Sequence, residues 1–163
     1  PREAYEAIEW NILVLIYGML ALGMAMESSG ASTLIASSVG FMSSAGMEGP
    51  MQIVLTLVVL YLITSILTEL LSNAATIVIM APISLEIANQ LQLGASDAKA
   101  FLLTTCIAAS ASFITPIGYQ TNTFVYTVGG YKFSDFAKIG IFLNLIYFTG
   151  TISLVCYFWD FGV

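Results

Sequence analysis

The chain has 163 residues, of which 58% are hydrophobic and only 9% are charged. A soluble domain carries roughly 25% charged residues, so this composition excludes an ordinary soluble fold and indicates a protein that lies in a lipid bilayer. The net charge of −6, with no basic stripe, excludes nucleic acid as a partner.

Long uncharged runs follow one another along the chain, and a helix needs about 20 apolar residues to cross the hydrocarbon layer. Several runs meet this length, so the sequence predicts an all-α polytopic membrane protein. Residues 11–27 predict a first span, with Trp10 at the interface. Residues 28–47 are uncharged but rich in Ser and Gly, which favours a short helix at the interface or packed against protein.

Residues 50–91 contain two apolar segments joined by the polar sequence TELLSN, which leaves no room for a polar turn of ordinary length. Two interpretations stay open. The segments form two complete spans with a tight turn, or they form a re-entrant hairpin whose tip, near 69–74, stops inside the membrane. We favour the hairpin, because Ser72 and Asn73 can satisfy backbone groups where no water reaches them.

Residues 98–131 predict a broken membrane helix with its break near 115–123. Pro116 lacks an N–H and clashes with the preceding turn, and Gly118 loosens the backbone further. Residues 138–160 predict an ordinary last span that ends in aromatic residues.

The few basic residues give an orientation. Arg2, Lys132 and Lys138 fall on one side of the membrane and Lys99 on the other. Basic residues are more frequent in cytoplasmic loops, so we expect a multi-pass protein of the plasma (inner) membrane with its C-terminus outside.

Two polar clusters fall at membrane depth. The first lies at the suspected tip (Thr68, Ser72, Asn73, Thr76) and the second at the suspected break (Thr115, Gly118, Gln120, Thr121, Asn122, Thr123). Irregular backbone at this depth is tolerated only where it is buried in protein or lines a cavity, and paired helix breaks are typical of transporter sites. Hydroxyl and amide oxygens suit sodium, and the helix N-terminus after Asn73 suits an anion. Helix packing is the alternative explanation for the small polar residues. Glu69 is either an interfacial residue, if the hairpin is shallow, or a functional acid, and we favour a structural or gating role.

Catalysis is not expected. The chain has no His, its two Cys are far apart, and the membrane segments hold no pair of acids. Haem and zinc therefore lack their usual ligands. We expect no enzyme, no catalytic residue and no organic cofactor.

The sequences SNAATIVIMAPI and TPIGYQTN, with IEWNILVLIYGMLALGMAMESSG upstream, resemble the C-terminal half of the divalent anion:sodium symporter family. This family comprises the sodium/sulfate and sodium/carboxylate cotransporters of the ion transporter superfamily. The resemblance implies two inverted repeats, each with a re-entrant hairpin and a broken helix, in a homodimer that works by elevator-like movement. Residues 1–163 would then be the C-terminal repeat, and the N-terminal repeat of the same protein would be missing.

The resemblance also implies the site. Na⁺ would be the coupling ion, held by Thr68, Ser72, Asn73, Thr115 and Gly118. The divalent anion would be held by Ser72, Asn73, Ala74, Thr115, Pro116, Thr121 and Asn122. Ala74 stands where the family has Thr, which leaves the choice between a sulfate-type oxyanion and a dicarboxylate open, although the GYQTNT segment resembles the sulfate-type branch. The alternative functions are a passive channel or pore subunit and a structural subunit of a membrane complex.

Overall fold

The computed structural model describes residues 10–44, 49–159 and 161, and these residues form α-helices joined by short connections, with no strand among them. The all-helical prediction is confirmed. The helices are α2 (Trp10–Ser28), α3 (Ala31–Ser44), α4 (Pro50–Leu70), α5 (Asn73–Gln90), α6 (Ala95–Ser110), α7 (Gln120–Gly129) and α8 (Phe133–Phe158). Residues 45–48, at the end of the expected interfacial segment, and residue 160, the last of the expected final span, lie outside the described residues.

Local chemistry explains several helix boundaries. Pro50 opens α4 at a position where its missing N–H costs nothing. Ser72 is the N-cap of α5, and its Oγ accepts a hydrogen bond of 3.2 Å from the Ala75 N–H. Gly130 ends α7 in the left-handed conformation, with φ of 64°. Only Leu71 and Ser72 separate α4 from α5, so the chain reverses within two residues.

Two of the described helices, α4 and α8, are long and apolar enough to cross a membrane by length and composition, with mean hydropathies of 2.3 and 1.9. Helix α8 turns much of its surface outward, including Ile139, Phe142, Leu145 and Leu154. In water such a surface would be unfavourable. Lipid is the medium that suits it.

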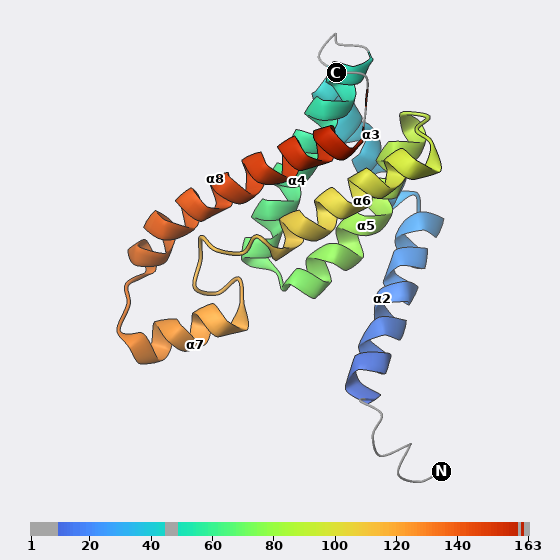
Figure 1. Ribbon diagram of the computed structural model, residues 1–163. Coiled ribbons are helices and arrows are strands. Elements are labelled where there is room, and N and C mark those ends of the chain that lie inside the picture. The colour runs from blue at the N-terminus through green and yellow to red at the C-terminus, as the bar shows by residue number, and fades with distance from the viewer. Residues whose placement is uncertain (1–9, 45–48, 160, 162–163) are drawn as a thin grey trace.

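Helices α4, α5 and α6 form the centre of the fold (Figure 1). Helix α3 packs against α4 and α5, and its residues Ser32, Ala36 and Val39 are buried. Helix α2 runs along α5, and α8 crosses α4 and α6. The lower end of α4, the start of α5 and the end of α6 meet near the middle of the picture, while α7 lies apart and buries none of its side chains (Figure 1). Three helix ends therefore converge on one region.

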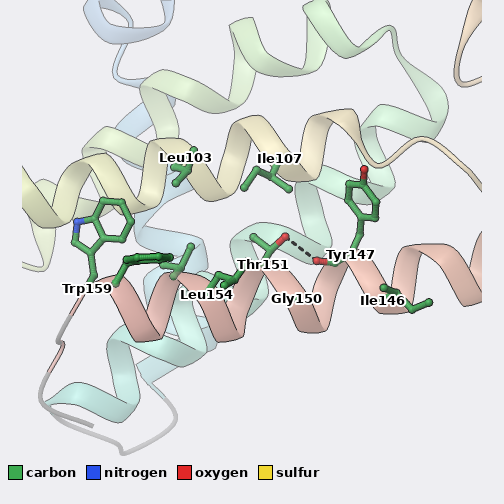
Figure 2. A pocket seen from close by; sticks show the side chains of 10 residues that line it. Leu103, Ile107, Ile146, Tyr147, Gly150, Thr151, Leu154 and Trp159 are labelled. Atoms are coloured by element: carbon green, nitrogen blue, oxygen red, sulfur yellow. Dashed lines mark hydrogen bonds between the residues drawn. The ribbon is translucent and has the colours of Figure 1, made fainter.

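An apolar groove of about 420 Å³ lies elsewhere, between α6 and α8 (Figure 2). Leu103 and Ile107 line it from α6, and Tyr147, Leu154 and Trp159 line it from α8 and its end. The Trp159 indole N–H donates to the Ser96 carbonyl oxygen at 2.8 Å, which ties the end of α8 to the start of α6. The groove offers almost no polar group, so it is not a candidate for binding an ion.

Candidate cation and anion site

The convergence point joins two interruptions of helix. We call residues 70–73, where α4 turns into α5, the tip, and residues 111–119, between α6 and α7, the break. The sequence placed the break near 115–123. In the structure it begins and ends four residues earlier, and residues 120–123 already belong to the first turn of α7. Irregular backbone in lipid needs partners for its polar groups, and most of those partners come from outside the break.

Glu69 holds the break against the tip. Its carboxylate accepts hydrogen bonds from the backbone N–H groups of Ile114 and Thr115, both at 2.8 Å, and the side chain is only 7% exposed. A carboxylate at the C-terminal end of a helix is repelled by the helix dipole. Two charge-assisted hydrogen bonds from the break offset that repulsion.

The break in return caps α4. The last carbonyl groups of a helix have no partner within it. The Ser112 hydroxyl donates to the Thr68 carbonyl oxygen, and the Thr115 hydroxyl donates to the Glu69 carbonyl oxygen, both at 3.3 Å. The Gly118 N–H then donates to the Thr115 Oγ1 at 3.1 Å. The end of α4 and the break therefore provide hydrogen-bond partners for each other.

Gly118 is required by this close approach. A Cβ at this position would lie 2.0 Å from the Ser112 Oγ and 3.1 Å from the Glu69 Oε2, and the residue is buried. A side chain at this position would force the Ser112 hydroxyl out of its place in the break.

We call the hydrogen bonds that join Glu69 to the break the clamp. Three oxygen atoms from three helices meet beside it. The Thr68 Oγ1 of α4 lies 2.8 Å from the Asn73 Oδ1 of α5, and it also contacts the Ala109 carbonyl oxygen of α6. A hydroxyl has one proton and can donate to only one of these two oxygens. Thr68 is fully buried, so this oxygen-rich cluster in a dry environment is chemically suited to a hard cation such as sodium.

A pocket of about 420 Å³ lies beside the tip. The residues that line it are Leu70, Leu71, Ser72 and Asn73 of the tip, Ala74 of α5, Ile117, Gly118 and Tyr119 of the break, and Gln120 and Thr123 of α7. The pocket thus faces the N-termini of both α5 and α7, and helix N-termini present free N–H groups and a positive dipole end. Such a pocket favours an anion.

The structure distributes the expected site residues over three places. The oxygen cluster includes Thr68 and Asn73. Thr115 belongs to the clamp, and the Gly118 N–H donates to its Oγ1. The pocket is lined by Ser72 and Ala74, and also by Asn73 and Gly118. Pro116 is buried, and its carbonyl oxygen accepts from the Thr123 hydroxyl at 2.8 Å.

Two expected anion ligands, Thr121 and Asn122, are not among the residues that line this pocket. The Asn122 amide of α7 donates to the Ser112 carbonyl oxygen at 3.1 Å, so it stabilises the break. Thr121 is exposed and is not among the residues that line the pocket. The structure thus groups neither residue with the anion pocket.

Sequence reasoning assigned no ligand role to several residues that build the site. Glu69 was visible as a lone charge in an uncharged region, and Gln120 as part of the polar cluster. Asn144 is an amide in an otherwise apolar span, which is a sequence signal for an interhelical contact. Gly140, which contacts the break closely, offered none, because one glycine in a membrane helix has no distinctive pattern.

The fold and the site together define a class. An apolar, all-helical chain that brings a helix turn and a helix break together around buried oxygens and a polar pocket has the architecture of a membrane transporter.

Comparison with known proteins gives the family. The citrate transporter family model matches residues 1–108, and the chain belongs to this family of transporters, which are integral membrane proteins and not enzymes. It is 46% identical over 155 residues to an uncharacterized transporter of Synechocystis. It is 31% identical over 156 residues to a probable sodium/sulfate cotransporter of Chlamydomonas reinhardtii, and 32% identical over 149 residues to solute carrier family 13 member 2 of Mus musculus. The resemblance drawn from the two motifs is confirmed.

The three alignments cover 95%, 95% and 89% of this chain, but only 24%, 16% and 23% of the relatives. The chain thus spans about a quarter or less of the length of these proteins. Residues 1–108 contain the tip, whereas the break at 111–119 lies beyond the family match.

Proposed function

We propose that this chain takes part in sodium-coupled symport of a divalent anion, either a sulfate-type oxyanion or a dicarboxylate. The observation that carries the proposal is the arrangement at the tip. The oxygens of Thr68, Asn73 and Ala109 meet next to it, with Thr68 and Ala109 fully buried, and a pocket that the first residues of α5 and α7 help to line lies beside it. A cation in the first place and an anion in the second share Asn73 between them. The names of the sodium/sulfate relatives support the same coupling.

Asn73 would couple the two ligands directly. Its Oδ1 faces Thr68 in the oxygen cluster, and the residue also lines the anion pocket. A sodium ion bound to this oxygen orders the amide and places positive charge next to the pocket. The anion then binds more tightly when sodium is present, and by reciprocity sodium binds more tightly when the anion is present.

We propose further that the turn between α4 and α5 is a re-entrant tip. Helix α6 has 16 residues, which at 1.5 Å each span about 24 Å, less than the roughly 30 Å of hydrocarbon. If α6 starts at the interface, with Asp97 and Lys99 in its first turns, the break falls inside the membrane. The tip, held to the break by Glu69, falls at the same depth. Helix α4, whose 21 residues are long enough to cross, is then tilted or begins outside the hydrocarbon.

The remaining features of the proposal follow the family resemblance. The chain acts as the C-terminal repeat beside an N-terminal repeat of the same protein, in a homodimer of the plasma membrane with the C-terminus outside. Lys99 lies near the end where Trp159 meets Ser96, and Lys132 caps the opposite end of α8. This separation agrees with the orientation that the basic residues predict.

The test uses the complete transporter with both repeats, purified in detergent. Thermal unfolding is compared in sodium chloride and choline chloride, each with sulfate, with succinate and without an added anion. A ligand of the native state raises the apparent stability by mass action. We expect a rise specific to sodium that one of the two anions enlarges. No response to any combination contradicts the proposal.

Asn73→Ala provides the matched test of the site in the same protein. We expect it to abolish sodium-dependent uptake into proteoliposomes, while the free energy of unfolding in choline falls by only about 1 kcal/mol for one lost hydrogen bond. Asn89→Ala is the control, because Asn89 is exposed at the far end of the same helix. Normal uptake by Asn73→Ala contradicts the assignment, and flux that needs no sodium favours a channel instead.

A further inference from the structure

Helix α8 has a buried line along a surface that is otherwise largely exposed. The buried residues of this helix are Gly140, Asn144, Thr151 and Val155. Residues four apart lie on the same face of a helix, so Gly140 and Asn144 point together toward one neighbour. That neighbour is the break.

Gly140 lies directly on the backbone of the break. A Cβ at this position would lie 2.1 Å from the Phe113 carbonyl oxygen and 2.7 Å from the Ile114 Cα. Backbone atoms cannot rotate away from such a contact as the end of a flexible side chain can. The surface of α8 therefore limits where residues 113 and 114 can lie, and these residues continue into the N–H groups that Glu69 holds.

Asn144 binds the break and α4 at once. Its Nδ2 donates to the Ala111 carbonyl oxygen at 3.1 Å and to the Ser65 Oγ at 3.0 Å, and the Ser65 hydroxyl is 3.3 Å from the Asn144 Oδ1. Asn144 is 9% exposed and Ser65 is 7% exposed. Ala111 is the first residue after α6, where a carbonyl group has lost its helical partner.

The bonds of Asn144 reach both sides of the oxygen cluster. Ser65 lies one turn before Thr68 on α4, and Ala111 lies two residues after Ala109 on α6. Thr68 and Ala109 each contribute one oxygen to that cluster. Fixing Ser65 and Ala111 to one amide therefore fixes the separation of α4 and α6 at the cluster, without any contact between Asn144 and the cluster itself.

We propose that Asn144, supported by the Gly140 contact, is a positioning residue for the cation site: it sets the geometry of the oxygens that bind sodium. The inference rests on the proposed function. Partners behind a ligand shell orient the ligands, and replacing such partners typically lowers metal affinity by about 10- to 100-fold. An amide that serves only helix packing would contribute to stability but leave the sodium affinity unchanged.

The test measures sodium affinity and intrinsic stability separately, in the complete transporter in detergent. Sodium is titrated against choline at constant ionic strength, the half-saturating sodium concentration is read from the rise in unfolding temperature, and stability is read in choline alone. For Asn144→Leu, which keeps a similar volume, we expect the half-saturating concentration to rise about tenfold or more.

Ser65→Ala is the second variant, because it keeps the bond from Asn144 to Ala111 and folds more readily than a variant with an unpaired carbonyl group. Loss of one interhelical hydrogen bond in a membrane changes an equilibrium constant by roughly a factor of three. We expect the half-saturating sodium concentration to rise by about that factor. Thr149→Val is the control on the same helix, since the Thr149 hydroxyl bonds only to carbonyl groups of its own helix.

The outcomes are distinct. The inference is overturned if Asn144→Leu and Ser65→Ala bind sodium as tightly as the unmodified transporter and are only less stable in choline. The proposed function would then remain intact. The same affinity change in Thr149→Val also overturns it, since the effect would then belong to any polar residue of α8. An unmodified transporter that shows no sodium-specific stabilisation overturns the proposed function, and the inference with it.

Discussion

The tip and the break interrupt helices at the same place but are stabilised in different ways. At the tip, the Leu71 N–H donates to the Leu67 carbonyl oxygen and the Ser72 Oγ accepts from the Ala75 N–H, so both partners lie within four residues along the chain. The break spans 111–119 and depends on side chains of α4, α7 and α8, namely Glu69, Asn122 and Asn144. The tip is a local structure, and the break is a tertiary one.

This difference has a functional meaning under the proposed mechanism. A local turn keeps its shape when its surroundings move, whereas the break keeps its shape only while three other helices hold it. Glu69 connects the two, because it belongs to the end of α4 and binds N–H groups of the break. The oxygen cluster combines oxygens of α4 and α6, and the hydrogen bonds of Glu69 to the break lie next to it and help to hold these two helices together.

Removing the clamp should have the largest effect. Glu69→Leu leaves the N–H groups of Ile114 and Thr115 without their acceptor. Each buried, unsatisfied group costs about 1 to 3 kcal/mol, so we expect the free energy of unfolding to fall by roughly 2 to 6 kcal/mol and sodium-dependent uptake to be lost. Thermal unfolding and uptake of the complete transporter measure both.

Two further variants sharpen this prediction. Glu69→Gln keeps one acceptor oxygen and should lose about half as much stability. Glu86→Leu is the matched control, because the Glu86 carboxylate bonds only to the exposed Gln90 side chain, at 3.3 Å. Stability of Glu69→Leu equal to that of Glu86→Leu would show that the carboxylate does not hold the break.

Crowding the break without removing any bonding group should have a smaller effect. Gly118→Ala places a Cβ 2.0 Å from the Ser112 Oγ, which must shift, and 3.1 Å from the Glu69 Oε2, which must move by a few tenths of an ångström. Overpacking of this kind costs about 1 to 3 kcal/mol, and we expect sodium-dependent uptake to fall with it. Gly150→Ala on α8 is the control, because nothing lies within 4 Å of the Cβ that it adds. Equal uptake by the two variants would contradict the close approach at Gly118.

The comparison also explains what the sequence could predict. The tip was placed near 69–74, and the structure turns at Leu71 and Ser72, because a polar Ser-Asn pair between two apolar segments is a local signal. The break was expected near 115–123 from Pro116 and Gly118, yet the helix ends at Ser110, five residues before Thr115. Neither Ala111 nor Ser112 has a strong tendency to end a helix. Their conformation is set by Asn144 and Asn122, which lie far away in sequence or beyond the break.

The same limit applies to the site residues. Thr68 and Asn73 lie five residues apart, and their proximity follows from the tight turn alone. Asn122 was expected to face the anion, but its orientation depends on how α7 leaves the break, which local sequence does not determine. Glu69 was recognised as unusual because it is charged, whereas its partners, two backbone N–H groups of the break, carry no sequence signal at all.

A change confined to the tip should have the smallest effect on stability. Ser72→Ala removes the N-cap of α5, whose loss typically costs about 1 kcal/mol, and it leaves the Glu69 clamp and the oxygens of Thr68, Asn73 and Ala109 in place. Ser72→Thr retains the capping oxygen and should restore most of the stability. Because Ser72 also lines the anion pocket, Ser72→Ala should weaken the anion-dependent part of the thermal shift and leave the sodium half-saturation nearly unchanged. A large rise in the sodium half-saturation would contradict this prediction, because it would show that the cap of α5 also holds Asn73 of the tip in the oxygen cluster.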